Sequence, residues 1–447
     1  MKSLVGALLF SVSAVFVAGC NGSSHHTTPT PPSLTFSAGS SFYFVNQFGT
    51  GTFDATTQQG DTIAGIAQDS LNNIYVAGST VGNLPGYSVP VGVSKGVVFG
   101  RDPDGNAVWA RELTTGAGDT INGMVLAGDY VIVAGTTKGA YPGASNPNGI
   151  SQVFLAELDA VGAVVWLYQY PSAGGITVEA LTQDANGNLI VAGEIAGGTT
   201  ARNLIVEKFD PKANLLWAMT YGTGAQDSMY GVTADSNGDI YVIGSASGAF
   251  PGSASGSPTT QFVAKVTGAN GSVVWVQQQG SVPALAGFTP SAILATANGQ
   301  LYLEGQTGTY GTDAQIEVMQ MSASAGAIAW HYLFGAGSSN IPGKSIVVDS
   351  NGNFYVAGMT GGALVSGATA GVDDVFLAKL SASGNAIWAQ QLGTGKEGPR
   401  VSSTVATPIY LNSGSMGVAV GGMTSGAFSG FSNPNQNADL FAARYGP

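Results

Sequence analysis

The tryptophans of this chain are regularly spaced. All six follow one another at intervals of 51–58 residues, each inside a similar short β-rich segment. The segment AIWAQQLGTG has a counterpart near the N-terminus, FYFVNQFGTG, in which Phe44 takes the place of tryptophan. Seven copies of one segment indicate a fold built by stacking similar units. The six tryptophans are Trp109, Trp166, Trp217, Trp275, Trp330 and Trp388.

Three other segments accompany each tryptophan. One contains a fixed glycine, as in IYVAGST; one is of the VFLAKL type; and one is a less regular run before the glycine segment. Each unit therefore holds four predicted strands: A (the irregular run), B (with the glycine), C (VFLAKL type) and D (with the tryptophan). The fixed glycines are Gly78, Gly135, Gly193, Gly244, Gly305, Gly358 and Gly422.

Four strands in each of seven units predict an all-β fold, a seven-bladed β-propeller with four-stranded blades. The chain begins with a D strand, at about 42–48, and ends with a C strand, at about 439–445. We expect this first strand to pair as the outer strand of the last blade, which closes the ring and removes its open edge. Small residues such as Gly65 and Gly231 predict that strand A is innermost, where strands crowd the axis.

Composition excludes several classes of partner. Only 9% of residues are charged, the net charge is −12, and Lys and Arg together number 14. This argues against nucleic-acid binding and against a basic membrane-binding patch, since both need clustered cations. Cys20 is the single cysteine, so a disulfide within the chain is excluded.

The N-terminus has the pattern of an export signal. Lys2 precedes an apolar run at 4–17 that is too short for a typical membrane span. It ends in Val-Ala-Gly-Cys, which resembles a bacterial lipobox and implies lipidation of Cys20. We predict a signal peptide at 1–19, a Ser/Thr/Pro-rich tether at 20–41 and the propeller at 42–447. Asn21 stands where Gram-negative lipoproteins kept at the inner membrane often carry Asp, which favours the outer membrane of the cell envelope.

Segments such as DVFLAKLSASGNAIWAQQLGTG and DSNGNFYVAGMTGG recur across residues 42–447. These segments resemble the bacterial SBBP (seven-bladed β-propeller) repeats. The resemblance implies the fold and carries no common activity. The chain departs from the pattern at Phe44, and at Glu157 and Gln320, which replace the usual Lys or Arg of strand C.

Loop lengths distinguish the two faces of the predicted ring. The A–B and C–D turns are short and of the Asn-Gly type that suits hairpins. The D–A and B–C connections are longer and meet on the opposite face, where function on a rigid scaffold tends to concentrate. The B–C loops repeat a motif of the Gly-Ala-Phe-Pro-Gly type, and we predict binding through its central residues. These are Leu84, Tyr141, Phe250 and Phe428.

Acidic residues suggest two further sites, each with a structural alternative. Asp61, Asp119 and Asp227 begin strand A and could hold a cation at the mouth of the axial channel, or each could cap its own turn. The Asp-x-Asn-Gly turns have calcium-like spacing but lack the bidentate Glu of a calcium loop, which favours hairpin turns. Calcium is the one cofactor kept as a candidate.

The remaining candidate groups have structural interpretations. We expect the tryptophans to pack blade against blade rather than to stack on a ligand. Basic residues of strand C are expected to form ion pairs or contacts between blades rather than a binding ring. His331 is the only histidine after the tether and lies in a predicted outer strand, away from the loop face. The basic residues are Arg101, Lys208, Lys265, Lys379 and Arg444.

These features predict a lipid-anchored, non-enzymatic binding or scaffolding module. Its expected partner is an envelope protein or a glycan, with membrane contact through the lipid only, no nucleic acid and a monomeric state. One alternative is a propeller enzyme, such as a lyase or a quinone-dependent dehydrogenase. Another is a scaffold for outer-membrane protein assembly.

Overall fold

The computed structural model describes residues 34–36, 42–48, 61–84, 86–87, 92–172, 174–196, 201–251, 260–279, 285–337, 340–365, 374–392, 404–410, 416–424 and 439–445. The predicted signal peptide, Cys20, most of the tether and Phe428 lie outside these residues. Within them, no helix is long and apolar enough to cross a membrane.

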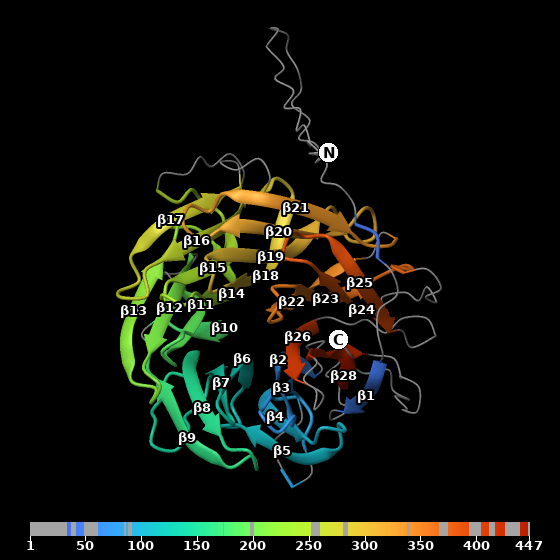
Figure 1. Ribbon diagram of the computed structural model, residues 1–447. Coiled ribbons are helices and arrows are strands. Elements are labelled where there is room, and N and C mark those ends of the chain that lie inside the picture. The colour runs from blue at the N-terminus through green and yellow to red at the C-terminus, as the bar shows by residue number, and fades with distance from the viewer. Residues whose placement is uncertain are drawn as a thin grey trace, which may run out of the picture. The chain divides into compact units, whose positions relative to one another are not determined.

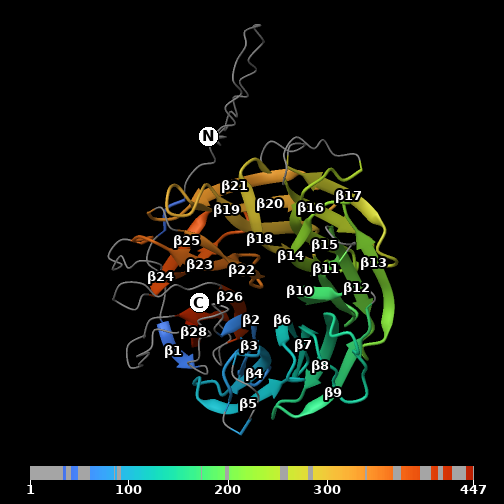
Figure 2. The same cartoon turned by 180° about the vertical axis from the view of Figure 1, so that it is seen from behind.

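The described residues form seven four-stranded antiparallel sheets, drawn in Figures 1 and 2. Four of these sheets, or blades, are formed by strands between residues 62 and 278. Blade 1 contains β2 (Thr62–Gln68), β3 (Ile74–Thr80), β4 (Lys95–Arg101) and β5 (Ala107–Leu113). Blade 2 contains β6 (Asp119–Ala127), β7 (Tyr130–Thr137), β8 (Gln152–Leu158) and β9 (Val164–Tyr170). Blade 3 contains β10 (Ile176–Gln183), β11 (Leu189–Ala196), β12 (Arg202–Phe209) and β13 (Leu215–Tyr221). Blade 4 contains β14 (Asp227–Ala234), β15 (Ile240–Ala246), β16 (Thr260–Val266) and β17 (Val273–Gln278).

The other three sheets follow, and the last also uses the first strand of the chain. Blade 5 contains β18 (Phe288–Ala295), β19 (Gln300–Thr307), β20 (Gln315–Ser322) and β21 (Ile328–Phe334). Blade 6 contains β22 (Ile341–Val348), β23 (Phe354–Thr360), β24 (Asp374–Leu380) and β25 (Ala386–Leu392). Blade 7 contains β26 (Thr404–Tyr410), β27 (Met416–Thr424), β28 (Asp439–Tyr445) and β1 (Phe42–Phe48).

The predicted four-stranded antiparallel blades, with strands in the order A to D, are confirmed. Each A strand contacts the A strands of both neighbouring blades, from β2 through β26 and back to β2, so the A strands form the inner wall of a closed ring. Figure 1 shows this wall around the axis and the D strands at the rim. The small residues fit their expected role, because a Cβ on Gly65 would lie 2.9 Å from Cβ of Met124 in the next A strand.

The ring closes where β1 pairs antiparallel with β28. In that pairing Phe44 lies opposite Arg444. This is the place that Trp217 holds opposite Lys208 in blade 3. The predicted pairing of the N-terminal strand with the last blade, in the D position, is therefore confirmed.

The fixed glycine of strand B is explained by close contact with strand A. Each A strand of blades 1–6 has a bulge, where its register against strand B shifts. The bulge brings a backbone carbonyl against the glycine. A Cβ on Gly193 would lie 2.1 Å from the carbonyl oxygen of Thr177, and one on Gly135 would lie 2.0 Å from that of Thr120. Any side chain here would push the two strands apart.

The tryptophans join neighbouring blades, as predicted. Trp109 of blade 1 donates its indole N–H to the carbonyl of Ala160 in blade 2, at 2.8 Å. Trp217 of blade 3 and Trp275 of blade 4 make the same bond to the C–D turn of the following blade. The apolar cores also lie between blades, since a single buried cluster combines side chains from two adjacent sheets.

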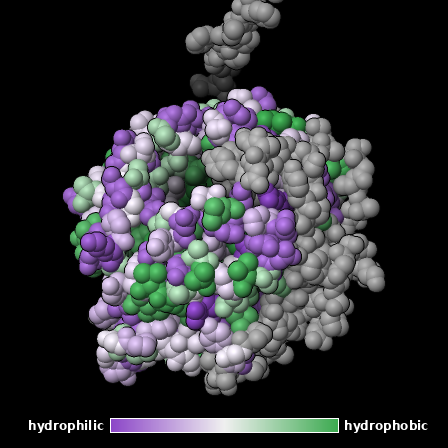
Figure 3. All heavy atoms as spheres, turned by 60° about the horizontal axis from the view of Figure 1, so that its bottom comes forward, coloured by the Kyte–Doolittle hydropathy of each residue, from purple (hydrophilic) through white to green (hydrophobic). Residues whose placement is uncertain are grey.

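Apolar side chains also lie on the surface, and Figure 3 shows them as patches among polar ones. The large exposed ones recur at the residues just before the tryptophan of strand D, near the short C–D turns. They are Val108, Val164, Val165, Leu215, Leu216, Val273, Val274 and Ile387.

Candidate functional site

The predicted binding residues of the B–C loops are buried. Leu84, Tyr141 and Phe250 expose only 6%, 5% and 7% of their surface. Tyr141 packs against Phe154 and Phe250 packs against Phe262, both in strand C of their own blade. These side chains anchor the loops, because burial of their large apolar surface is worth more than exposure at a tip. Little of these three side chains is left for a partner to touch, and binding through their loops stays a prediction.

A glutamine of strand D fixes each of three B–C loops. The side chain of Gln278 accepts a hydrogen bond from the backbone N–H of Phe250 at 3.1 Å and donates to the carbonyl of Gly248 at 2.7 Å. Gln169 makes the equivalent pair of bonds to Tyr141 and Gly139. Gln391 binds the loop of blade 6 through Leu364 in the same way. We call these contacts the loop clamps. The signal in the sequence was a Gln three residues after the tryptophan.

Blade 1 builds its clamp from charged groups. Glu112 replaces the glutamine and accepts from the backbone N–H of Leu84 at 2.6 Å. Since a carboxylate cannot donate, Lys95 supplies the bond to the carbonyl of Gly82. Burial lowers the pKa of Lys95 and raises the pKa of Glu112, while the attraction between the two side chains opposes both shifts.

The predicted acidic group at the channel mouth lies inside the D–A turns. Asp61, Asp119 and Asp227 are buried, with at most 1% of their surface exposed. Asp119 accepts from the backbone N–H of Thr115 at 2.7 Å, and Asp227 accepts from that of Thr223 at 2.8 Å. Asp61 accepts from the hydroxyl of Thr80. Asp119 and Asp227 thus cap backbone turns, the structural alternative considered for them.

The Asp-x-Asn-Gly segments form the expected hairpin turns. Asp184 accepts from the backbone N–H groups of Asn186 and Asn188 and pairs with Lys208 at 2.9 Å. Lys265 and Lys379 make comparable pairs with Asp239 and Asp349. Among the described residues, no group of three or more His, Cys, Asp or Glu could hold a metal ion.

Arg101 departs from the predicted alignment of strand C. Gly100, not Arg101, lies opposite Trp109. The guanidinium of Arg101 instead lies 3.9 Å from the centre of the Phe48 ring, a cation–π contact that joins blade 1 to β1. The predicted contact between blades exists, although it is made from a different position of the strand.

His331 lies in outer strand β21. Its Nδ1 is 2.7 Å from Glu317 Oε1, and the same carboxylate accepts a hydrogen bond from Thr307. The carboxylate therefore stands between the hydroxyl and the imidazole. A hydroxyl nucleophile needs the imidazole next to it, so these three groups do not form a hydrolase triad.

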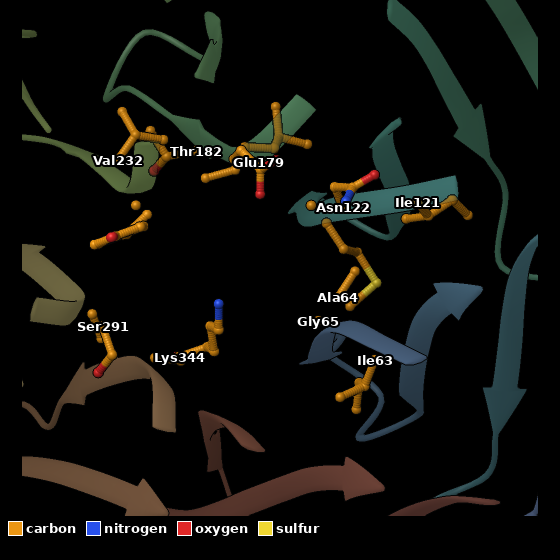
Figure 4. Close-up of a pocket in the computed structure, with 18 of the residues that line it drawn as sticks. Ile63, Ala64, Gly65, Ile121, Asn122, Glu179, Thr182, Val232, Ser291 and Lys344 are labelled. Atoms are coloured by element: carbon orange, nitrogen blue, oxygen red, sulfur yellow. The ribbon is translucent and has the colours of Figure 1, made fainter. Parts of the chain in front are cut away.

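The axial channel contains a cavity of about 590 Å³, which is within the size range of small-molecule sites. The A strands of blades 1–6 line it. Most of the lining is apolar or carries hydroxyl and amide groups, and its two charged residues are Glu179 and Lys344. Figure 4 shows both side chains directed into the cavity from opposite walls. Neither residue was predicted from the sequence as a site residue.

The environment of Glu179 raises its pKa to about 7. Burial is the main cause, and the neighbouring Glu194 adds to it, while the positive charges of Lys344 and Arg202 oppose it. Arg202 forms an ion pair with Glu194, at 2.5 Å. Glu179 has no ion pair of its own among the contacts of the described residues, so its carboxyl group is available to a ligand.

Four-stranded blades stacked around an axial cavity define a β-propeller. The family model described as the SBBP β-propeller repeat matches residues 44–85, 221–251 and 329–364. The chain therefore carries SBBP repeats in these three regions, the repeat that its recurring segments resemble. No curated protein matches it significantly.

Several solved structures match the chain at low similarity. The N-terminal domain of Nup159 matches with a TM-score of 0.44 and 9% identity, over 93% of this chain and 100% of that one. Quinohemoprotein alcohol dehydrogenase from Comamonas testosteroni matches with a TM-score of 0.43 and 12% identity, over 90% and 76%. The quinohemoprotein alcohol dehydrogenase ADHIIG from Pseudomonas putida HK5 matches with 0.42 and 9%, over 91% and 76%. Likeness at this level supports no inference about activity.

Proposed function

We propose that this propeller is an exported, lipid-anchored binding module of the bacterial cell envelope, attached through Cys20 to the outer membrane. It holds an envelope protein or a glycan on the face formed by the B–C and D–A loops. It acts as a monomer without nucleic acid, and touches the membrane only through its lipid. The Val-Ala-Gly-Cys motif supports the anchor.

The loop clamps are the observation that carries the binding role. They fix three B–C loops to the rigid blades through buried hydrogen bonds. Loop residues that are already held in place lose little entropy when a partner binds, so the clamps favour recognition. Since Leu84, Tyr141 and Phe250 are buried, contact with the partner falls to exposed loop residues. Tyr310, with 47% of its surface exposed, lies in the B–C loop of blade 5.

The test begins with the anchor. Cells that express the full chain should incorporate labelled fatty acid into the protein and retain it in the outer-membrane fraction. Cys20→Ser should abolish both. Equal labelling of the two proteins would refute lipidation at Cys20.

The binding role is tested on a partner captured from native membranes and identified. Tyr310→Ala and Lys138→Ala alter exposed residues of the loop face, while Asp104→Ala alters an exposed residue in a short turn of the other face. We expect the loop-face variants to weaken binding and the Asp104 variant to bind normally. Loss of binding only in Asp104→Ala would place the partner on the opposite face. Co-purification of an outer-membrane barrel protein would favour the assembly-scaffold alternative over glycan binding.

An enzyme is the second candidate, and Glu179 is the observation that favours it. A carboxyl group with a pKa of about 7 in an open cavity can exchange a proton at neutral pH, as a general acid or base must. This would suit a lyase more directly than a quinone-dependent dehydrogenase. Any activity of the purified protein should then be lost in Glu179→Gln, and an activity unchanged by that substitution would exclude this role. Calcium stays a proposal to be checked by its effect on thermal stability.

A further inference from the structure

The A strands of blades 1–6 each contain a bulge residue that does not follow the repeat. At the bulge an extra residue interrupts the pairing with strand B, for example Asn122 between Ile121 and Gly123. In β22 the bulge is wider and includes Lys344. All six bulge residues line the axial cavity. We call them the bulge ring: Ala64, Asn122, Glu179, Tyr230, Ser291 and Lys344.

The bulge ring differs in chemistry at every blade, whereas its surroundings repeat. The next strand keeps its fixed glycine, and each bulge occupies the same place opposite it. If the ring served only to pack the inner wall, the same small residue would suffice in every blade, as Ala64 does in blade 1. Six different residues in equivalent positions, all lining one cavity, instead fit recognition of an asymmetric ligand.

A second departure from the repeat supports Lys344. Glu304 of β19 stands immediately before the fixed glycine, where four other blades have alanine. It is fully buried, and its Oε1 accepts a hydrogen bond from the backbone N–H of Gly343, next to Lys344, at 3.2 Å. A buried carboxyl group is costly to keep. Here it supports the one bulge that is wider than the others and that carries the cation.

We propose that the bulge ring binds a small zwitterionic ligand of the amino-acid class, with its ammonium group at Glu179 and its carboxylate at Lys344. The two side chains lie on opposite walls of the cavity and form no ion pair with each other within the described residues. Yet they are near enough for the charge of Lys344 to act on Glu179. A ligand with one charge would leave one of them unmatched. Asn122 and Ser291 offer neutral polar contacts beside them. This inference is independent of the proposed loop-face partner.

The test is calorimetric titration of the detergent-solubilised full chain with glycine, β-alanine, 4-aminobutyrate and 5-aminopentanoate. This series varies the distance between the two charges. For each length, an alkylamine and a carboxylic acid serve as singly charged probes. We expect at least one zwitterion to bind about tenfold or more tightly than both of its singly charged analogues, since each lost charged hydrogen bond weakens binding on that scale.

Variants assign the binding to the ring. Glu179→Gln and Lys344→Met should each weaken the best zwitterion about tenfold or more. The matched control Lys212→Met, an exposed lysine in the short C–D turn of blade 3, should bind like the unmodified protein. Thermal unfolding of all variants should stay within a few degrees of the unmodified protein.

Three results would overturn the proposal. The first is no binding by any zwitterion, and the second is binding that both ring variants retain. The third is equal binding of the carboxylic acid, lost only in Lys344→Met, which would define a simple anion site. Each of them leaves the loop-face proposal standing, because that proposal is tested by partner capture.

Discussion

The residues that repeat in every blade, such as the fixed glycines of strand B, form a frame. The bulge ring lies in the neighbouring A strands, and its residues differ from blade to blade. Frame positions keep one residue type from blade to blade, as the fixed glycine does at Gly135 and Gly193, because each copy meets the same backbone atom. The bulge ring changes at every blade and faces an open cavity. Within one chain, repetition therefore marks residues that hold the propeller together, and variation at an equivalent position marks residues free to serve a ligand.

The largest expected effect belongs to a fixed glycine. In Gly193→Ala the new Cβ would lie 2.1 Å from the carbonyl oxygen of Thr177, so β10 and β11 must separate. We expect a loss of about 3–4 kcal/mol in the free energy of unfolding, measured by urea denaturation. Gly231→Ala is the control, because its Cβ would approach side chains and no backbone atom, with Ile243 at 3.3 Å and Ile293 at 3.8 Å. If both variants lost the same free energy of unfolding, the fixed glycine of the frame would be no more restricted than a glycine of the inner wall.

Glu207 of strand C departs from the repeat within the frame, and we expect it to lower the stability of the folded protein. Departures in the bulge ring are not expected to do so. Glu207 of strand C is buried, one of its oxygens lacks a hydrogen-bond partner, and burial raises its pKa to about 7. The folded protein therefore holds this proton more tightly than the unfolded chain. Below about pH 4.5 both states are protonated and there is no penalty. Stability then falls as the pH rises to about 7, by up to ~3 kcal/mol, and stays reduced above it.

Glu207→Gln should remove that pH dependence. We expect the variant to match the unmodified protein at pH 4 and to exceed it at pH 8, as followed by denaturation at several pH values. A variant that is equally stable or less stable at pH 8 would show that the carboxylate finds a compensating partner in the folded protein.

Removing a loop clamp should have a smaller effect. Gln278→Ala leaves the backbone N–H of Phe250 and the carbonyl of Gly248 without their partner. We expect a loss of about 2 kcal/mol, since buried unpaired polar groups are costly. Hydrogen exchange should rise in the B–C loop of blade 4 and stay unchanged in that of blade 2, which keeps Gln169. Uniform exchange in both loops would mean that the clamp does not act locally.

The smallest effect is expected in the ring itself. Asn122→Ala removes one contact, the hydrogen bond that Asn122 accepts from Thr120. Its side chain faces the cavity, so we expect a change within about 0.5 kcal/mol by urea denaturation. A loss comparable to that of Gln278→Ala would assign the ring a structural role and weaken the case for ligand binding.

The sequence predicted the four-stranded blade and the pairing of the ends because both rest on local signals. Asn-Gly turns mark the hairpins, and Phe44 occupies the place of a tryptophan at the start of the chain. The pairing of Phe44 with Arg444 confirms that alignment. Arg101 was placed wrongly, since its neighbour Gly100 gives no sign of occupying the basic position.

The site was less accessible to sequence reasoning. Tyr141 and Phe250 lie in B–C loops rich in Gly and Pro, which suggested that they are exposed. Their rings instead pack against phenylalanines in strand C of their own blades. The bulge ring was missed because a bulge shifts the alternation of inward and outward side chains in the middle of a strand. A comparison of the repeats could have shown Glu179 and Lys344 as the charged exceptions in strand A.

The pairing of β1 with β28 has a consequence for the order of folding. Phe48 and Leu440 lie opposite each other although 392 positions separate them. At a synthesis rate of ~5–20 residues per second, the first strand waits roughly 20–80 s before its partner exists. During that interval β1 and the growing last blade both have incomplete sheet edges, open to pairing with another chain. Ring closure is thus a late folding step, and until it occurs β1 must be kept from pairing with another chain.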